Sequence, residues 1–145
     1  MGERVPQTYA NHARFDPPYH FFLLPVTMLN FLVSVWKLIR HPGAETIWMA
    51  VLALAAVVAV FKIRLYALRV QDRLIRLEER WRLHSLLAEP LRSRIGELSE
   101  EQLIGLRFGS DAEMPALVEK ALAGKMKRRD IKKAVAQWRP DYFRV

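Results

Sequence analysis

The chain has 145 residues, of which 52% are apolar and 26% are charged, and its formal net charge at pH 7 is +8. Cysteine is absent, which excludes disulfides, thiolate catalysis and cysteine-bound metal. The charges are segregated: residues 19–61 carry only three, whereas residues 62–145 carry 19 Lys and Arg against 12 Asp and Glu. Because a charge in hydrocarbon costs several kcal/mol, this pattern predicts an integral membrane protein with a basic, water-facing second half.

Two apolar runs follow a short polar N-terminal segment, residues 1–18. The first run covers residues 19–39, and about 20 residues suffice to cross the ~30 Å of hydrocarbon in a bilayer. The second run covers residues 46–68, where Lys62 and Arg64 can extend their stems and place their charges at the interface. Both runs are predicted to be transmembrane helices. A signal peptide is the competing interpretation of the first run, but the run is long and no small-residue cleavage site follows it.

The turn between the two runs, residues 40–45, contains Pro42 and Gly43, which stop a helix. So short a connection joins antiparallel neighbours. Basic residues are scarcer in this turn than beyond the second run, so the positive-inside rule places the turn in the periplasm and both termini in the cytoplasm. We therefore expect an all-α protein: a transmembrane two-helix hairpin whose second helix extends into the cytoplasm, followed by a small helical domain within residues 69–145.

Three polar residues share one face of the first predicted span, because Thr27, Asn30 and Ser34 are spaced three and four apart. A mid-membrane amide is costly to leave unpaired, so this face should contact another helix rather than lipid. Two partners remain open, the alanine-rich second span of the same chain and a neighbouring subunit.

Beyond the membrane, apolar residues continue with alternating spacings of four and three as far as Trp81, which is typical of a helix-packing seam. We call Val70, Leu74, Leu77 and Trp81 the seam. It is predicted to be a docking surface, either for the chain's own C-terminal helices folding back or for another chain. Folding back is the interpretation that we favour from sequence.

Three short helices are predicted after Pro90, which stops the long one. The sequence Ser99-Glu100-Glu101-Gln102 has the pattern of a capping box. A second helix should run from about Ser110 to Gly124, and a third from about Arg128 to Gln137, with Trp138 continuing its apolar face. Two more aromatic residues, Tyr142 and Phe143, follow Pro140 at once. We expect all three aromatic side chains to be buried against this chain or a partner.

The most basic stretch lies in and before the last predicted helix and comprises Lys125, Lys127, Arg128, Arg129, Lys132 and Lys133. Such residues are attracted to an anionic leaflet at ~1 kcal/mol each, bind an acidic partner, or form a merely solvated face. Nucleic acid is the least favoured partner, because no recognised nucleic-acid fold or stacking array accompanies the charge.

The sequence contains no phosphate-binding glycine loop, serine nucleophile elbow or zinc-protease helix. The four histidines are scattered, so no metal site is predicted. His20, at the start of the first span, is a candidate haem or pigment ligand, although a polar anchor at the interface is the simpler interpretation. We expect neither enzymatic activity nor a cofactor.

Several segments together are distinctive in their order, including Tyr9-Ala10-Asn11-His12, Arg40-His41-Pro42, Val70-Gln71-Asp72-Arg73 and the ending Trp138-Arg139-Pro140-Asp141-Tyr142-Phe143-Arg144-Val145. Through these segments the chain resembles an uncharacterised family of small bacterial two-span membrane proteins, which is classed as a domain of unknown function. The resemblance covers nearly the whole chain. It implies a two-span architecture and a bacterial source, and it implies no activity, substrate or cofactor.

Two functional hypotheses follow from these observations. The first is a non-catalytic accessory or scaffolding subunit of a larger bacterial inner-membrane complex, such as an energy-converting photosynthetic or respiratory one, with other integral membrane subunits as partners. The second is a self-associating membrane-surface adaptor, a homodimer that binds anionic lipid through its basic C-terminal helices.

Overall fold

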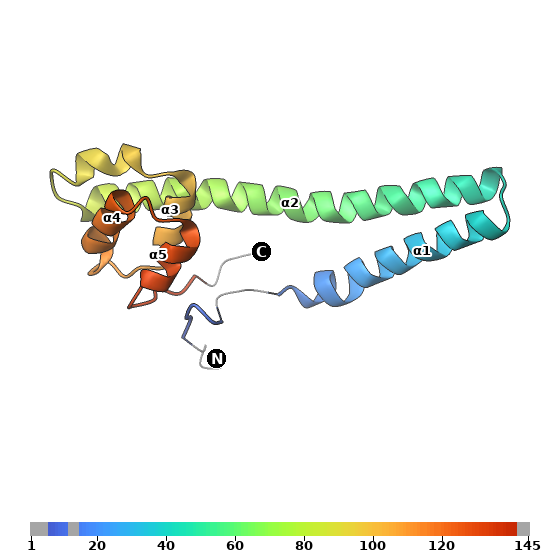
Figure 1. Cartoon of the computed structure of the whole chain (residues 1–145), viewed down its shortest axis with the longest axis horizontal. Helices are drawn as coiled ribbons and strands as arrows, with labels where there is room; N and C mark the ends of the chain where they lie inside the picture. Colours follow the sequence, from blue (N-terminus) through green and yellow to red (C-terminus); the bar gives the residue numbers. More distant parts are fainter. Residues whose placement is uncertain (1–5, 12–14, 142–145) are drawn as a thin grey trace. The chain divides into compact units, whose positions relative to one another are not determined.

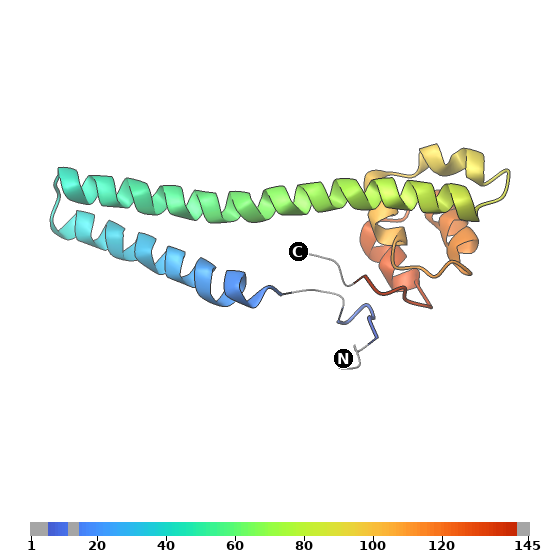
Figure 2. The same ribbon diagram turned by 180° about the vertical axis from the view of Figure 1, so that it is seen from behind.

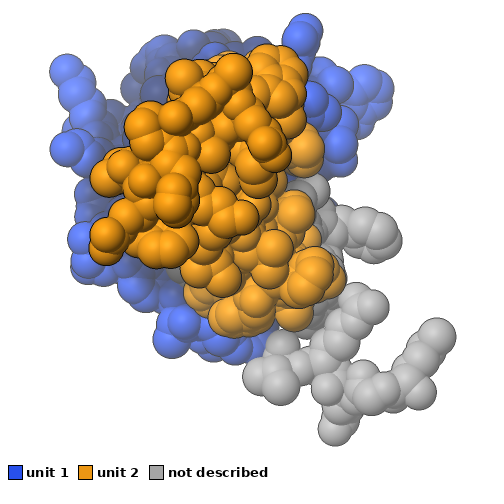
Figure 3. Space-filling view, turned by 90° about the vertical axis from the view of Figure 1, so that its right-hand side faces the viewer, with its two compact units in different colours: residues 1–14, 70–144 blue, residues 15–69, 145 orange. Residues whose placement is uncertain are grey.

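The structure, a computed structural model, describes residues 6–11 and 15–141 and is all-helical within them (Figure 1). These residues form two compact units, coloured separately in Figure 3. Unit 1 contains residues 6–11 and 70–141, and unit 2 contains residues 15–69. One helix, α2 (Ala44–Leu86), contributes to both units.

Unit 2 begins with a wide π-helical turn, η1 (Pro18–Leu23), which continues into α1 (Leu24–Arg40). Pro25 lies at the second position of α1, where the π-helical turn passes into the α-helix. Thr46 holds the turn to α2, because its hydroxyl accepts a bond from the Gly43 N–H at 3.0 Å and contacts the carbonyl oxygens of His41 and Gly43.

Two helices, Pro18–Arg40 and Ala44–Leu86, are long and apolar enough to cross a membrane. Only 6% and 11% of their most apolar windows are buried within the chain, whereas the core helix of a soluble protein is mostly buried. In unit 2 the buried residues are Thr27 and Ser34 on α1 and Ala53 and Val60 on α2. The two residues of each pair are seven positions apart and lie on one face of their helix. In unit 2, α1 and α2 therefore each bury one narrow face and leave their other, largely apolar faces exposed.

Unit 1 is built from the C-terminal part of α2 and four short helices: η2 (Arg92–Glu97), a 3₁₀ helix, then α3 (Glu100–Leu106), α4 (Met114–Ala123) and α5 (Arg128–Ala134). Figures 1 and 2 show α3, α4 and α5 gathered against this part of α2. The core consists of fully or almost fully buried apolar side chains, among them Leu83, Leu87, Leu103, Leu106, Phe108, Met114, Leu117, Val118, Ala121 and Ile131.

The predicted capping box at the start of α3 is present. The Ser99 hydroxyl accepts a bond from the Gln102 N–H, and the Gln102 side chain accepts one from the Ser99 N–H at 2.8 Å. The amide group of Gln102 also donates to the Ala121 carbonyl at 2.9 Å, which ties α3 to the end of α4. The cap therefore positions a tertiary contact as well as a helix end.

The last helix is shorter than predicted from the sequence, since α5 ends at Ala134 rather than near Gln137. The backbone becomes extended at Val135, and the segment after it pairs with residues 108–110. Ser110 donates its N–H to the Gln137 carbonyl, and Arg139 donates its N–H to the Phe108 carbonyl at 2.7 Å. These long-range bonds replace the helical ones that the local sequence favoured.

Candidate functional site

In unit 1, α2 has two opposite faces with different roles. Ile75, Glu79 and Leu83 are buried at 7%, 4% and 0% exposure and point to the core, where α3–α5 pack. The seam lies on the other side of the helix, since its positions are offset from these by about half a turn. Its four side chains are all exposed, from 54% for Leu74 to 78% for Trp81.

The expectation that the chain's own short helices fold back onto the seam is therefore wrong. They pack on the face that carries Glu79. This face was not recognised from the sequence, because a carboxylate interrupts its apolar spacing. Trp81 and Val70 are the most exposed seam residues, at 78% and 70%. A row of large exposed apolar side chains is unusual on a soluble surface and is typical of interaction surfaces.

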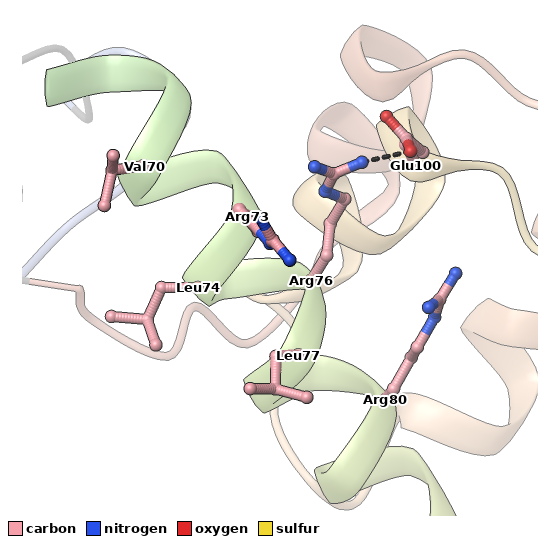
Figure 4. A pocket seen from close by; sticks show the side chains of 7 residues that line it. All are labelled: Val70, Arg73, Leu74, Arg76, Leu77, Arg80 and Glu100. Carbon is pink, nitrogen blue, oxygen red and sulfur yellow. Dashed lines mark ion pairs between the residues drawn. The ribbon is translucent and has the colours of Figure 1, made fainter. Parts of the chain in front are cut away.

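A groove of about 500 Å³ runs along one edge of the seam (Figure 4). Its lining residues are Val70, Arg73, Leu74, Arg76, Leu77, Arg80 and Glu100. Figure 4 shows Val70, Leu74 and Leu77 on one side of α2, with Arg76 reaching the other way to an ion pair with Glu100. That ion pair joins α2 to the first turn of α3. The groove thus combines an apolar wall with a basic one.

On the face of α2 opposite the seam, a largely buried ionic cluster joins α2 to the loops of unit 1. The Arg82 guanidinium donates to Glu79 at 3.1 Å, to the Gly109 carbonyl at 2.7 Å and to Asp111 at 2.8 Å and 2.5 Å. Arg139 approaches the other Glu79 oxygen at 3.5 Å. Burial raises the pKa of the Glu79 carboxyl above its ordinary value, and the neighbouring arginines oppose that rise without cancelling it.

Cations and aromatic rings meet at Phe108, which is fully buried. Trp138 packs on it with ring centroids 4.8 Å apart, and the Arg107 guanidinium and the Lys132 ammonium lie 4.5 Å and 5.0 Å from the Phe108 centroid. Trp138 is half-buried, although it leaves the helix whose apolar face it was expected to continue. Tyr142 and Phe143 lie outside the described residues.

Lys132 was predicted to bind an anionic leaflet or an acidic partner, or to face solvent, and the structure corrects this, because its exposure is only 8%. Its stem packs in the core and its charge rests on the Phe108 ring. Of the other predicted basic residues, Lys127, Arg128 and Arg129 line a shallow cavity of about 330 Å³ together with Lys132, Tyr9 and Glu101. Lys125 and Lys133 are not among its lining residues.

The N-terminal segment contacts this region, and no pattern in the sequence predicts that contact. Gln7 and Asp141 exchange two hydrogen bonds, of 3.1 Å and 2.8 Å, between the Gln7 amide and the Asp141 backbone. Arg129 donates to the Tyr9 hydroxyl at 3.2 Å, and Lys133 lies 5.9 Å from the Tyr9 ring centroid. Residues before the first predicted span therefore belong to the same compact unit as residues after the second.

The three residues of the polar stripe in the first predicted span differ in their exposure. Thr27 and Ser34 are buried, and the Thr27 hydroxyl donates to the Leu23 carbonyl at 2.6 Å. Asn30 is exposed. The candidate ligand His20 contacts the Asp16 backbone through Nδ1 and packs edge-on against Phe15. Its imidazole is thus held by the turn at the start of the first predicted span.

Within the described part of the chain, no group of three His, Asp or Glu side chains is placed to hold a metal ion. The features that unit 1 offers are surfaces: the seam with its basic groove, and the shallow basic cavity beside Tyr9.

A family described as "Family of unknown function (DUF6526)" matches residues 3–145, so the chain belongs to that family. No curated protein and no solved structure matches the chain.

Proposed function

We propose that the chain is a non-catalytic scaffolding subunit of a larger bacterial inner-membrane complex, and that it assembles through the seam. The exposure of Val70, Leu74, Leu77 and Trp81 carries this proposal. These side chains lie beyond the apolar spans, on a helix whose opposite face is already buried in unit 1. Apolar surface of this kind is stabilised by covering it with another protein surface.

The anchor in this proposal is a transmembrane hairpin formed by α1 and the N-terminal part of α2. The contacts of Gln7 with Asp141 and of Tyr9 with Arg129 support it. Residues before the first span can touch residues after the second only if both segments lie on the same side of the membrane. The excess of arginine after the second span favours the cytoplasmic side. A bacterial inner membrane fits that charge distribution and the resemblance to bacterial proteins.

Purification of the tagged chain from its native membrane in a mild detergent tests the proposal. We expect an assembly larger than one chain, and we expect Leu77→Asp to shift the chain toward the monomer. Because Leu77 is 65% exposed, the substitution should leave unit 1 folded. Ala116→Asp, at an exposed position of α4, is the matched control and should leave the assembly intact. A wild-type chain that is a stable lone monomer would overturn the proposal.

A second function, binding of anionic lipid by a membrane-surface adaptor, is favoured by the shallow cavity beside Tyr9. Lys127, Arg128 and Arg129 line this cavity together with one carboxylate, that of Glu101. If the cavity binds lipid phosphate, the purified chain should retain phosphatidylglycerol, and Arg128→Ala should lower the amount retained. Arg94→Ala, on η2, serves as the control, and equal retention by both variants would contradict lipid binding at this cavity.

A further inference from the structure

We propose that the partner of the seam is a second copy of this chain, with the two α2 helices parallel. The inference rests on the proposed function, because it takes the membrane anchor and the seam from it. It adds the identity of the partner and the direction in which the partner binds.

The spacing of the seam assigns its residues to the two core positions of a heptad. Leu74 and Trp81 occupy position a, and Val70 and Leu77 occupy position d. The core-facing Ile75 and Glu79 then fall at positions b and f, on the far side of the helix. The short helices of unit 1 therefore pack away from the seam, and a second helix can approach it without displacing them.

The charges beside the seam match a parallel pair. Arg73 and Arg80 occupy position g, and Glu78 occupies position e; all three are exposed. In a parallel coiled coil, position g of one helix meets position e of the other helix five residues further on. Arg73 of one copy therefore faces Glu78 of the second, and symmetry provides the same contact twice.

An antiparallel pair would instead bring g positions against g positions, so that arginine would face arginine. The membrane excludes that arrangement independently, because two copies with the same topology must send α2 out of the bilayer in the same direction. The fixed direction and the charge pattern thus agree.

The groove beside the seam is suited to receive the partner's carboxylate. Arg73 and Arg80 line it together with the apolar side chains of Leu74 and Leu77. Arg76 is held by Glu100, so the basic wall of the groove is tied to α3. Two heptads associate weakly on their own, but confinement of both anchors to one membrane raises their effective concentration.

Disulfide crosslinking of the full-length chain in its native membrane tests the inference, since the absence of native cysteine makes every introduced thiol unique. Leu74→Cys and Leu77→Cys place thiols at positions a and d, where equivalent residues of a parallel pair face each other. Both should give a covalent dimer of this chain under mild oxidation. Ala116→Cys, on the exposed surface of α4, should not.

Charge exchange provides a second readout that a merely structural role would not change. Arg73→Glu alone and Glu78→Arg alone should each lower the yield of the Leu77→Cys dimer about fivefold, because like charges then face each other. The double variant Arg73→Glu/Glu78→Arg should restore the yield. Arg94→Glu, away from the seam, should leave it unchanged.

The outcomes separate this inference from the proposed function. If a photocrosslinker at Leu77 captures an unlike chain while neither thiol variant gives a dimer, the seam is a docking site but the second copy is wrong. If no crosslink of either kind forms and Leu77→Asp leaves the assembly intact, both are wrong. A dimer whose yield is the same in the wild-type background and in both single charge variants would overturn the contact between Arg73 of one copy and Glu78 of the other.

Discussion

Arg82→Met should loosen unit 1 strongly at neutral pH and weakly at acidic pH. The substitution keeps the apolar stem but removes every bond from Arg82 to Glu79, Gly109 and Asp111. Asp111 is exposed, so losing its ion pair with Arg82 costs little stability. Glu79 is 4% exposed and would keep Arg139, at 3.5 Å, and the charge of Arg107.

The expected loss is about 3 kcal/mol at neutral pH, the lower end of the range for breaking a buried ion pair by removing one partner. Arg82 is the strongest of the arginines that oppose the raised pKa of the Glu79 carboxyl, so its removal raises that pKa further. A raised pKa means that the folded state binds the proton more tightly than the unfolded state. The loss should therefore shrink as the pH falls and Glu79 becomes neutral.

Hydrogen exchange by mass spectrometry on the full chain in detergent measures the effect, with variant and wild type compared at each pH. A loss of about 3 kcal/mol corresponds to exchange about 100-fold faster in α3 and α4 when they open together with unit 1. Arg94→Met, which breaks the exposed pair with Glu97, is the control and should exchange like the wild type. Wild-type exchange in Arg82→Met at pH 7, or a difference that grows on acidification, would refute the reasoning.

Three further predictions concern unit 1. The stability of the wild type should decline as the pH rises above about 4.5 through the raised pKa of the Glu79 carboxyl, and Glu79→Gln should reduce this decline. Melting temperatures of wild type and variant that change in parallel between pH 4 and pH 8 would contradict it. Ser99→Ala should cost about 1 kcal/mol and speed exchange in the first turn of α3, because the cap is lost. Gly105→Ala should destabilise unit 1 by up to about 2 kcal/mol, because a new methyl group 3.2 Å from the Ile131 Cβ and 3.3 Å from the Arg128 carbonyl oxygen costs about 1–3 kcal/mol, of which the better helix propensity of alanine offsets about 1. Gly96→Ala has open space around it, and an equal melting shift in both variants would show that no clash occurs.

Local signals in the sequence predicted the local features of the fold. The alternation of a 21-residue apolar run, a Pro-Gly turn and a second run predicts two long apolar helices, and the pattern around Ser99 predicts a cap whose bonds lie within four residues. The end of α5 was not predictable in this way. It depends on hydrogen bonds between Arg139 and Phe108 and between Ser110 and Gln137, whose partners are far apart in the sequence.

The candidate site shows the same division. The seam was predicted as a docking surface because its apolar spacing is regular, but the face of α2 that binds the short helices was missed. That face carries Glu79 and Arg82, whose burial is compensated by their ion pair and by the bonds from Arg82 to the Gly109 carbonyl and Asp111. The burial of Lys132 could not be predicted either, because nothing in a run of basic residues indicates that one lysine packs on the ring of Phe108.

Cysteine labelling in whole cells tests most directly the claim that two spans place both ends of the chain in the cytoplasm. Gly43→Cys and Gly96→Cys form a matched pair in this cysteine-free chain. Neither of these two glycines has a positive φ, a new Cβ at Gly43 would meet only Thr46 at 4.0 Å, and one at Gly96 would meet nothing within 4 Å. A membrane-impermeant maleimide added outside the inner membrane should label Gly43→Cys at once and Gly96→Cys only after the membrane is opened. Labelling of Gly96→Cys in intact cells, or of both thiols alike, would contradict the account.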